Sequence, residues 1–186
     1  MINTEDKLKD ETPHFAKPVL YAGAVDKARI SIYNEDCLQA LKAMADNQFD
    51  LAIVDPPYGI GMDGTIGIGI GKEKGFTRKK EYTKKNWDKE VPSQEYFDEL
   101  FRVSKNQIVW GANYFEGLPA EKGWLIWNKC ADMTQAQAEL AWSNCVANAR
   151  VFDKSPLGVF GNGGLNGELK QHPTQKPVSL MEWCIN

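Results

Sequence analysis

Asp55, Pro56, Pro57 and Tyr58 bring together groups that can recognise an amino group on a flat ring. The carboxylate of Asp55 can accept a hydrogen bond from such an amino group, and a carbonyl held by the prolines can accept a second. The ring of Tyr58 offers a face for stacking. Drawing electron density onto the nitrogen in this way makes it a better nucleophile. The alternative is a Pro-rich turn whose Asp and Tyr are merely exposed.

The segment Phe49–Val54 (FDLAIV) predicts the strand that positions these groups. It is a short, nearly unbroken apolar run, which is typical of a strand buried on both faces of a parallel sheet. Pro56 and Pro57 lack a backbone N–H and fix φ, so neither a ladder nor a helix can continue beyond Asp55. Open α/β sheets place their ligands at the carboxyl ends of such strands. We therefore expect a site immediately after Val54.

Three segments, in their order, resemble motifs of the amino-group DNA methyltransferases of the permuted class often called beta. Residues 55–58 (DPPY) resemble the catalytic motif, 34–37 (NEDC) the lead-in ahead of it, and 172–177 (HPTQKP) the segment that wraps the methionine end of the cofactor. The resemblance spans roughly residue 30 to the end. It implies an α/β fold with a Rossmann-like methyltransferase sheet, and methyl transfer from S-adenosylmethionine to the amino group of adenine or, less often, cytosine in DNA. Such enzymes are common in restriction-modification systems and phages.

The resemblance also implies roles for individual residues. Asp55, Pro56, Pro57 and Tyr58 would be catalytic, and the cofactor would contact Asp36, Cys37, Thr174, Gln175, Lys176 and Pro177. Other interpretations stay open: Asp36 also suits the N-cap of a helix over 37–45, and 174–177 also suits a capped helix start ahead of 178–183. A carboxylate bound at that start would meet the helix dipole and the Lys176 ammonium.

Length and composition fit one soluble domain. The chain has 186 residues, of which 25% are charged and 42% hydrophobic. We interpret 1–28 as an N-terminal arm and 29–186 as a methyltransferase domain. No signal peptide is apparent, and no apolar run approaches the length of a membrane span. Four widely separated cysteines and only two histidines predict reduced thiols, no metal site and a cytoplasmic location.

A basic segment interrupts a chain whose formal net charge is −3. It holds eight basic and three acidic residues. The basic residues are Lys72, Lys74, Arg78, Lys79, Lys80, Lys84, Lys85 and Lys89. Such a patch predicts contact with the phosphates of double-stranded DNA, and the alternative is a solvated loop. The Gly/Lys-rich region around it, about 59–90, is expected to be a mobile lid or a DNA-contacting loop.

The glycines after Tyr58 match a nucleotide-binding pattern only in part. Gly59, Gly61 and Gly64 satisfy G-x-G-x-x-G, but the DPPY segment separates them from the strand, and more glycine follows where a helix is required. Gly71-Lys72 likewise lacks the flanking residues of a P-loop. We therefore expect no nucleotide cradle here.

The remaining elements should place several polar residues at one edge of a sheet. Residues 96–103 predict a helix with Phe97, Leu100 and Phe101 in the core. Strands are predicted over 29–33, 107–110, 124–127, 139–142 and 149–152, the last two as a hairpin. Strand ends are followed by Asp36, Asp55, Asn113 and Asn128, which line one edge if the strands are parallel. Each Asn is otherwise a turn former.

The family's F-x-G-x-G cofactor segment should follow the helix that begins near Val178, but the sequence stops at Asn186. In the family's sheet that segment's strand runs beside the catalytic strand, which would otherwise have an uncovered apolar edge. We expect a longer gene product. A partner or second copy that completes the sheet, or a catalytically incomplete DNA-binding remnant, are the alternatives. A glutamine-amide methyltransferase is disfavoured, because that chemistry usually goes with Asn in place of Asp55.

Overall fold

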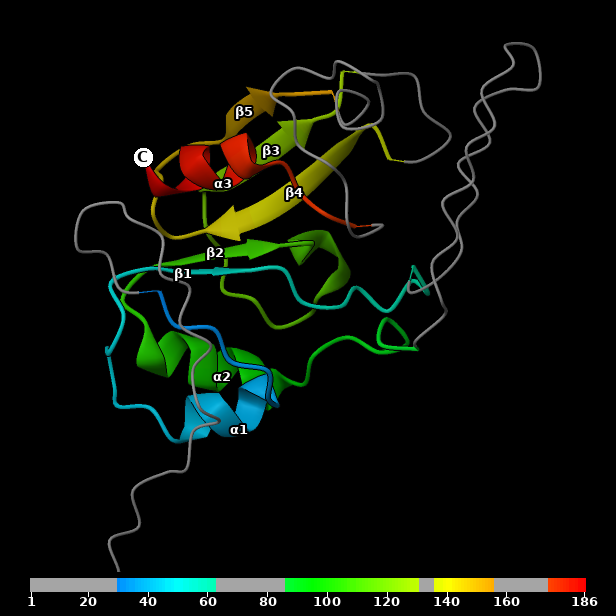
Figure 1. Ribbon diagram of the computed structural model, residues 1–186. Coiled ribbons are helices and arrows are strands. Elements are labelled where there is room, and N and C mark those ends of the chain that lie inside the picture. The colour runs from blue at the N-terminus through cyan, green and yellow to red at the C-terminus, as the bar shows by residue number, and fades with distance from the viewer. Residues whose placement is uncertain (1–29, 63–85, 131–135, 156–173) are drawn as a thin grey trace, which may run out of the picture.

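A five-stranded mixed sheet forms the centre of the molecule (Figure 1). The computed structural model describes residues 30–62, 86–130, 136–155 and 174–186. The strands are β1 (Ala52–Val54), β2 (Gln107–Trp110), β3 (Trp124–Asn128), β4 (Ala138–Ser143) and β5 (Arg150–Asp153), in the order β1-β2-β4-β3-β5. β1 pairs parallel with β2, β3 pairs parallel with β5, and β4 lies antiparallel between β2 and β3. The carboxyl ends of β1, β2, β3 and β5 therefore share one edge of the sheet.

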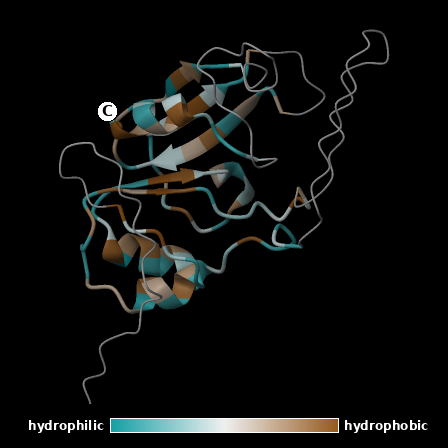
Figure 2. Ribbon diagram, viewed as in Figure 1, coloured by the Kyte–Doolittle hydropathy of each residue, from teal (hydrophilic) through white to brown (hydrophobic). Residues whose placement is uncertain are grey.

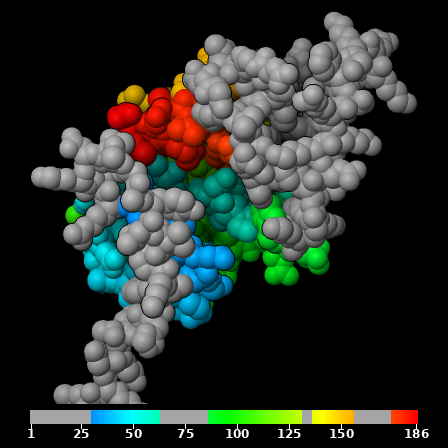
Figure 3. Space-filling model, in the orientation of Figure 1, coloured from blue at the N-terminus to red at the C-terminus, as the bar shows by residue number. Residues whose placement is uncertain are grey.

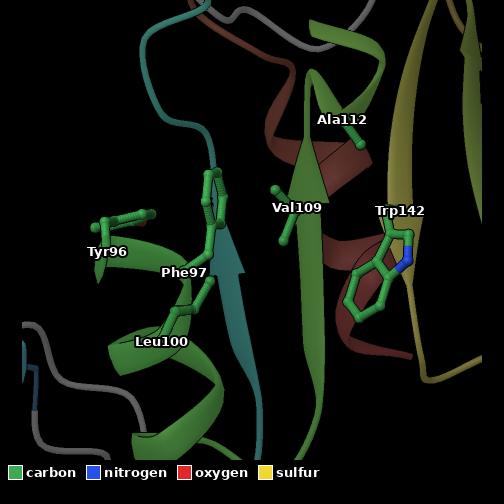
Figure 4. Packing of buried hydrophobic residues seen from close by; sticks show 6 residues of the cluster. All are labelled: Tyr96, Phe97, Leu100, Val109, Ala112 and Trp142. Atoms are coloured by element: carbon green, nitrogen blue, oxygen red, sulfur yellow. The ribbon is translucent and has the colours of Figure 1, made fainter. Parts of the chain in front are cut away.

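Helices cover both faces of this sheet. They are α1 (Cys37–Lys42), α2 (Gln94–Val103), the short 3-10 helix η1 (Ala112–Tyr114) and α3 (Val178–Ile185). Val109 of β2 lies in one apolar cluster with Phe97 of α2, which Figure 4 shows from close by. Ile108 and Trp110 lie in a second cluster with Leu180 of α3. Because successive strand side chains point to opposite faces, α2 and α3 lie on opposite sides of β2.

Strand β2 and helix α2 form where the sequence predicts them. All four residues of β2 are buried, and Figure 2 shows this strand as hydrophobic. Ser93 caps α2, Phe97 and Leu100 are buried, and Phe101 is partly buried against the same cluster. No helix among the described residues has both the length and the apolar character needed to cross a membrane.

Strand β1 is shorter and more exposed than predicted. Phe49 forms an isolated parallel bridge with Ser104, and the continuous strand begins only at Ala52. Within the described part of the chain β1 pairs with β2 alone. Its three residues are half-buried rather than fully buried, which agrees with its place as an outermost strand of the described sheet.

The strand predicted over 29–33 is wrong for the residues that the structure describes. Residues 30–33 have no strand conformation, and Ile30, Ile32 and Tyr33 are exposed. A strand needs a hydrogen-bonding neighbour, and no described strand pairs with this segment. Alternation of apolar residues indicated the conformation that the segment favours but not whether a neighbour is present.

The predicted hairpin of the last two strands is also wrong. β4 and β5 do not pair with each other, because β3 lies between them and bonds to both. Asn128 pairs with Ala138 on one side and with Asp153 on the other. Short strands of similar pattern do not specify their neighbours, so the sequence alone left this pairing undetermined.

Candidate active site

Polar side chains gather at the edge where the parallel strands end. Asp55 directly follows β1, Asn113 lies in η1 just after β2, and Asn128 is the last residue of β3. β4 runs in the opposite direction, so Glu139 near its start reaches the same edge. The predicted gathering at one edge is confirmed for Asp55, Asn113 and Asn128, but not for Asp36, which follows no strand among the described residues.

Lys176 connects this edge to the segment that precedes α3. Its Nζ lies 2.6 Å from Asp55 Oδ1 and 3.1 Å from Glu139 Oε2, and it donates to the hydroxyl of Tyr58 at 3.0 Å. The Lys176 side chain is only 7% exposed. Figure 3 shows the surface atoms of the segment after β1 beside those of the C-terminal segment. The two motif segments, distant in sequence, therefore meet in one ionic cluster.

Glu139 holds Lys176 from the other side. Its Oε1 pairs with Lys129 Nζ at 2.8 Å, so two ammonium groups and two carboxylates alternate along the cluster. Burial raises the pKa of Glu139, but the charges of Lys176 and Lys129 outweigh this effect and hold that pKa below its usual value. Glu139 is thus a carboxylate that anchors both lysines.

Tyr58 is fixed at its hydroxyl and at its ring. The hydroxyl donates to Asp55 Oδ1 at 2.6 Å. Burial, together with the charge of Asp55, raises the pKa of Tyr58 far above its usual value, so the hydroxyl stays protonated and acts as a donor. The ring stacks on Tyr114 with centroids 5.1 Å apart and an interplanar angle of 13°. The open stacking face expected from the sequence is thus covered on one side by Tyr114.

Gly111 allows the ring of Tyr58 to lie against the backbone. A Cβ at Gly111 would lie 2.1 Å from Cε1 of Tyr58 and 2.5 Å from both neighbouring ring atoms, which places it above the ring face. Gly111 also has φ of 74°, in the left-handed region. Glycine is therefore required here for both space and backbone conformation.

Asp55 is anchored through one oxygen only. Tyr58 and Lys176 both donate to Oδ1, whereas Oδ2 makes no hydrogen bond to any described residue. The Asp55 side chain is 39% exposed, in contrast to the buried ammonium of Lys176. The ion pair thus orients the carboxylate and leaves its second oxygen as an acceptor at the edge of the sheet.

The residues predicted to bind a cofactor belong to two elements, the start of α1 and the segment that leads into α3. Asp36 caps α1, accepting the N–H of Gln39 at 3.0 Å, as its alternative interpretation predicted, and Cys37 is exposed in the first turn of that helix. Thr174, Gln175, Lys176 and Pro177 lead into α3, whose N-cap is Pro177. No hydrogen bond or ion pair within the described part of the chain joins Asp36 to Asp55 or Lys176. A cofactor carboxylate at Lys176 would compete with the two carboxylates already bound there.

The predicted DNA-binding residues cannot be placed on this surface. Lys72, Lys74, Arg78, Lys79, Lys80, Lys84 and Lys85 lie outside the described residues, as do His172 and Pro173 of the cofactor motif. Lys89 is described and exposed. The described residues contain no cluster of three or more side chains suited to a metal ion.

Sequence analysis missed Glu139 and Asp88. A charged residue inside the apolar strand AELAWS was the available signal for Glu139, because a buried charge needs a partner. Asp88, which is 2% exposed, carried no such signal within its charged surroundings. Searches of protein-family models and of curated proteins found no match to this chain, so its functional interpretation depends on its own residues and geometry.

Proposed function

We propose that this chain forms the catalytic part of a DNA methyltransferase that transfers a methyl group from S-adenosylmethionine to the exocyclic amino group of adenine. The observation that carries the proposal is the state of Asp55 directly after a parallel strand: one oxygen is held by Lys176 and Tyr58, and the other has no hydrogen-bond partner among the described residues. Ligands of open α/β sheets bind at such strand ends. The mixed sheet is compatible with the Rossmann-like methyltransferase fold that the motifs imply.

The target base would be recognised through its amino group. A base in a duplex must leave the stack, at a cost of a few kcal/mol that contacts in the pocket offset. Asp55 Oδ2 accepts one amino hydrogen and the carbonyl of Pro56 accepts the other, which directs the nitrogen's lone pair toward the methyl group. Most of the rate enhancement would come from this positioning.

The ring of Tyr58 would provide the stacking surface. Tyr114 occupies a stacking position on Tyr58, and the residue is 41% exposed. An extruded base would take the place of Tyr114 on the Tyr58 ring. Aromatic stacking of this kind contributes about 1 to 3 kcal/mol per base.

The start of α3 fits the anionic end of the cofactor. No side chain caps this helix, and the hydroxyl oxygen of Ser179 in its first turn is buried with no hydrogen-bond partner among the described residues. A carboxylate placed there would meet the positive end of the helix dipole. S-adenosylmethionine, when bound, supplies an electrophilic methyl group. Thr174, Gln175 and Ser179 would hold its carboxylate end, with Lys176 nearby.

Replacing Asp55 tests the proposal most simply. The full-length protein is assayed for transfer of labelled methyl groups to duplex DNA, and DNA affinity is measured in parallel. Asp55→Ala should abolish transfer and leave most of the DNA affinity, because the carboxylate acts on the amino group and not on the phosphates. Asp50→Ala is the matched control, since Asp50 precedes the same strand and its side chain is 91% exposed. Full activity of Asp55→Ala would contradict the catalytic role.

A further inference from the structure

The carboxylate of Asp88 lies inside a ring of backbone N–H groups from the segment that follows Pro57. Oδ1 accepts the N–H of Tyr58 at 2.7 Å and of Gly59 at 2.9 Å, and Oδ2 accepts the N–H of Met62 at 2.7 Å. The backbone carbonyl of Asp88 accepts the N–H of Gly61 at 2.9 Å. Asp88 therefore binds four backbone amides of one short segment.

Two glycines allow these amides to converge. Gly59 and Gly61 both have φ of 71°, a left-handed conformation that other residues rarely adopt. Successive amides that point to one centre form an anion-binding nest. Gly59 and Gly61, the first two glycines of the G-x-G-x-x-G match, thus lie in an anion cradle, and the anion within it is a side chain of the same protein.

The burial of Asp88 indicates that these bonds are strong. The residue is 2% exposed, and within the described part of the chain it has no cationic partner. A buried carboxylate is costly unless hydrogen bonds compensate it, and bonds from N–H groups to a charged oxygen are stronger than neutral ones. The negative charge is thus stabilised by the N–H groups of the 58–62 segment.

We propose that Asp88 is a positioning residue for Tyr58 and, through it, for Asp55. Tyr58 is held at two points: its backbone N–H by Asp88, and its hydroxyl by Asp55 Oδ1. Loss of the Asp88 carboxylate frees the backbone of the segment and lets the Tyr58 hydroxyl move away from Asp55. This role rests on the proposed methyl transfer for its catalytic consequence, but its structural part can be measured independently.

Amide hydrogen exchange on the full chain tests the structural part. In Asp88→Asn an amide nitrogen replaces one accepting oxygen and the charge is lost, with little change in shape. We expect the amides of Tyr58, Gly59 and Met62 to exchange about tenfold faster than in the wild type, because one acceptor oxygen is replaced by a donor and the remaining oxygen no longer carries charge. Peptides from α2 and β3 should be unchanged. Asp98→Asn is the matched control, since Asp98 is an exposed acid on α2 whose carboxylate accepts from Gln94 alone among the described residues.

Kinetics test the catalytic part. Asp88→Asn should lower kcat by tenfold to about a hundredfold, the order expected for misplaced catalytic groups, with KM for S-adenosylmethionine unchanged. Asp88→Glu, which keeps the charge, should recover part of this loss.

Unchanged exchange at 58–62 in folded Asp88→Asn, or an equal increase throughout the protein, would overturn the inference. If Asp88→Asn does not fold, Asp88→Glu is judged by the same exchange criterion. A wild type without methyl transfer would overturn the proposed function, while exchange would still decide the role of Asp88.

Discussion

The ammonium of Lys176 lies 2.6 Å from Oδ1 of Asp55, although 121 positions separate the two residues in sequence. The contact joins the segment predicted to catalyse with the segment predicted to hold the cofactor. Glu139 holds the same ammonium at 3.1 Å, so Lys176 has a fixed place between two carboxylates. In this arrangement Lys176 orients the carboxylate of Asp55, for which we propose a catalytic role, in addition to any contact with a ligand.

Lys176→Met should destabilise the protein strongly. The change leaves Glu139, whose side chain is 23% exposed, with Lys129 as its remaining cation, and it frees Asp55. Removing one member of a buried ion pair leaves an uncompensated charge, and we expect a loss of about 2 to 4 kcal/mol in the free energy of unfolding, measured with urea. Methyl transfer should fall as well.

Lys42→Met is the matched control for this experiment. Lys42 pairs with Glu95 at 2.7 Å, but both side chains are well exposed, and such pairs contribute about 0 to 1 kcal/mol. Equal losses of unfolding free energy in the two variants would show that Lys176 stabilises the protein no more than a lysine in a surface ion pair does.

The stabilising contribution of Glu139 should decrease at acidic pH. Because the folded state holds the pKa of Glu139 below the ordinary value of 4.5, the folded protein binds this proton less readily than the unfolded chain. The contribution of Glu139 to stability is therefore complete above pH 4.5 and is lost as the pH falls through the lowered pKa. We expect the difference in unfolding free energy between wild type and Glu139→Gln to be constant near neutral pH and to shrink below pH 4.5. Parallel curves across this range would contradict the assignment.

Gly111→Ala should displace Tyr58. The new Cβ would lie 2.1 Å from the ring, so the ring must move away from Asp55, and we expect a loss of about 3 kcal/mol in stability together with most of the activity. Gly61→Ala separates this clash from backbone strain. Its φ of 71° is nearly the same, but nothing lies within 4 Å of the new Cβ, so only about 1 kcal/mol should be lost. Similar losses in both variants would exclude the contact between Gly111 and Tyr58 as the cause.

Removing the charges of Lys79 and Lys80 should weaken DNA binding. Fewer phosphate contacts release fewer counterions, so the plot of log affinity against log salt concentration should become flatter by about one unit per lost contact. Lys105→Ala serves as the control, because Lys105 is exposed and precedes β2, at the opposite edge of the sheet from Asp55. An unchanged slope in the double variant would exclude this segment as the DNA-binding surface.

Local sequence signals predicted the elements that form from local causes. The spacing of Phe97 and Leu100 indicated α2, and the segment Gln107–Trp110, apolar after its first residue, indicated the buried strand β2. Asp55 could be placed at a strand end because Pro56 and Pro57 forbid continuation of the strand. In each case the relevant interaction lies within a few residues of the chain.

Features that depend on distant partners could not be predicted. The segment 30–33 has strand-forming residues but no described neighbour, and β3 rather than β5 pairs with β4. The bonds from Asp88 to the 58–62 segment and from Glu139 to Lys176 cross long sequence separations, and no spacing rule marks them. Even the glycines, whose conformational freedom was evident, gave no indication of which anion they surround.

The identity of the methylated nucleoside tests the central claim most directly. The full-length protein is incubated with duplex DNA and S-adenosylmethionine carrying a deuterated methyl group, and the DNA is then digested to nucleosides for mass spectrometry. The account predicts label on N6 of adenine in wild type and none with Asp55→Ala. Label on the amino group of cytosine would support amino-group methylation but identify cytosine, not adenine, as the target base. Absence of label from every nucleoside, or label on carbon 5 of cytosine, would contradict an amino-group methyltransferase built around Asp55.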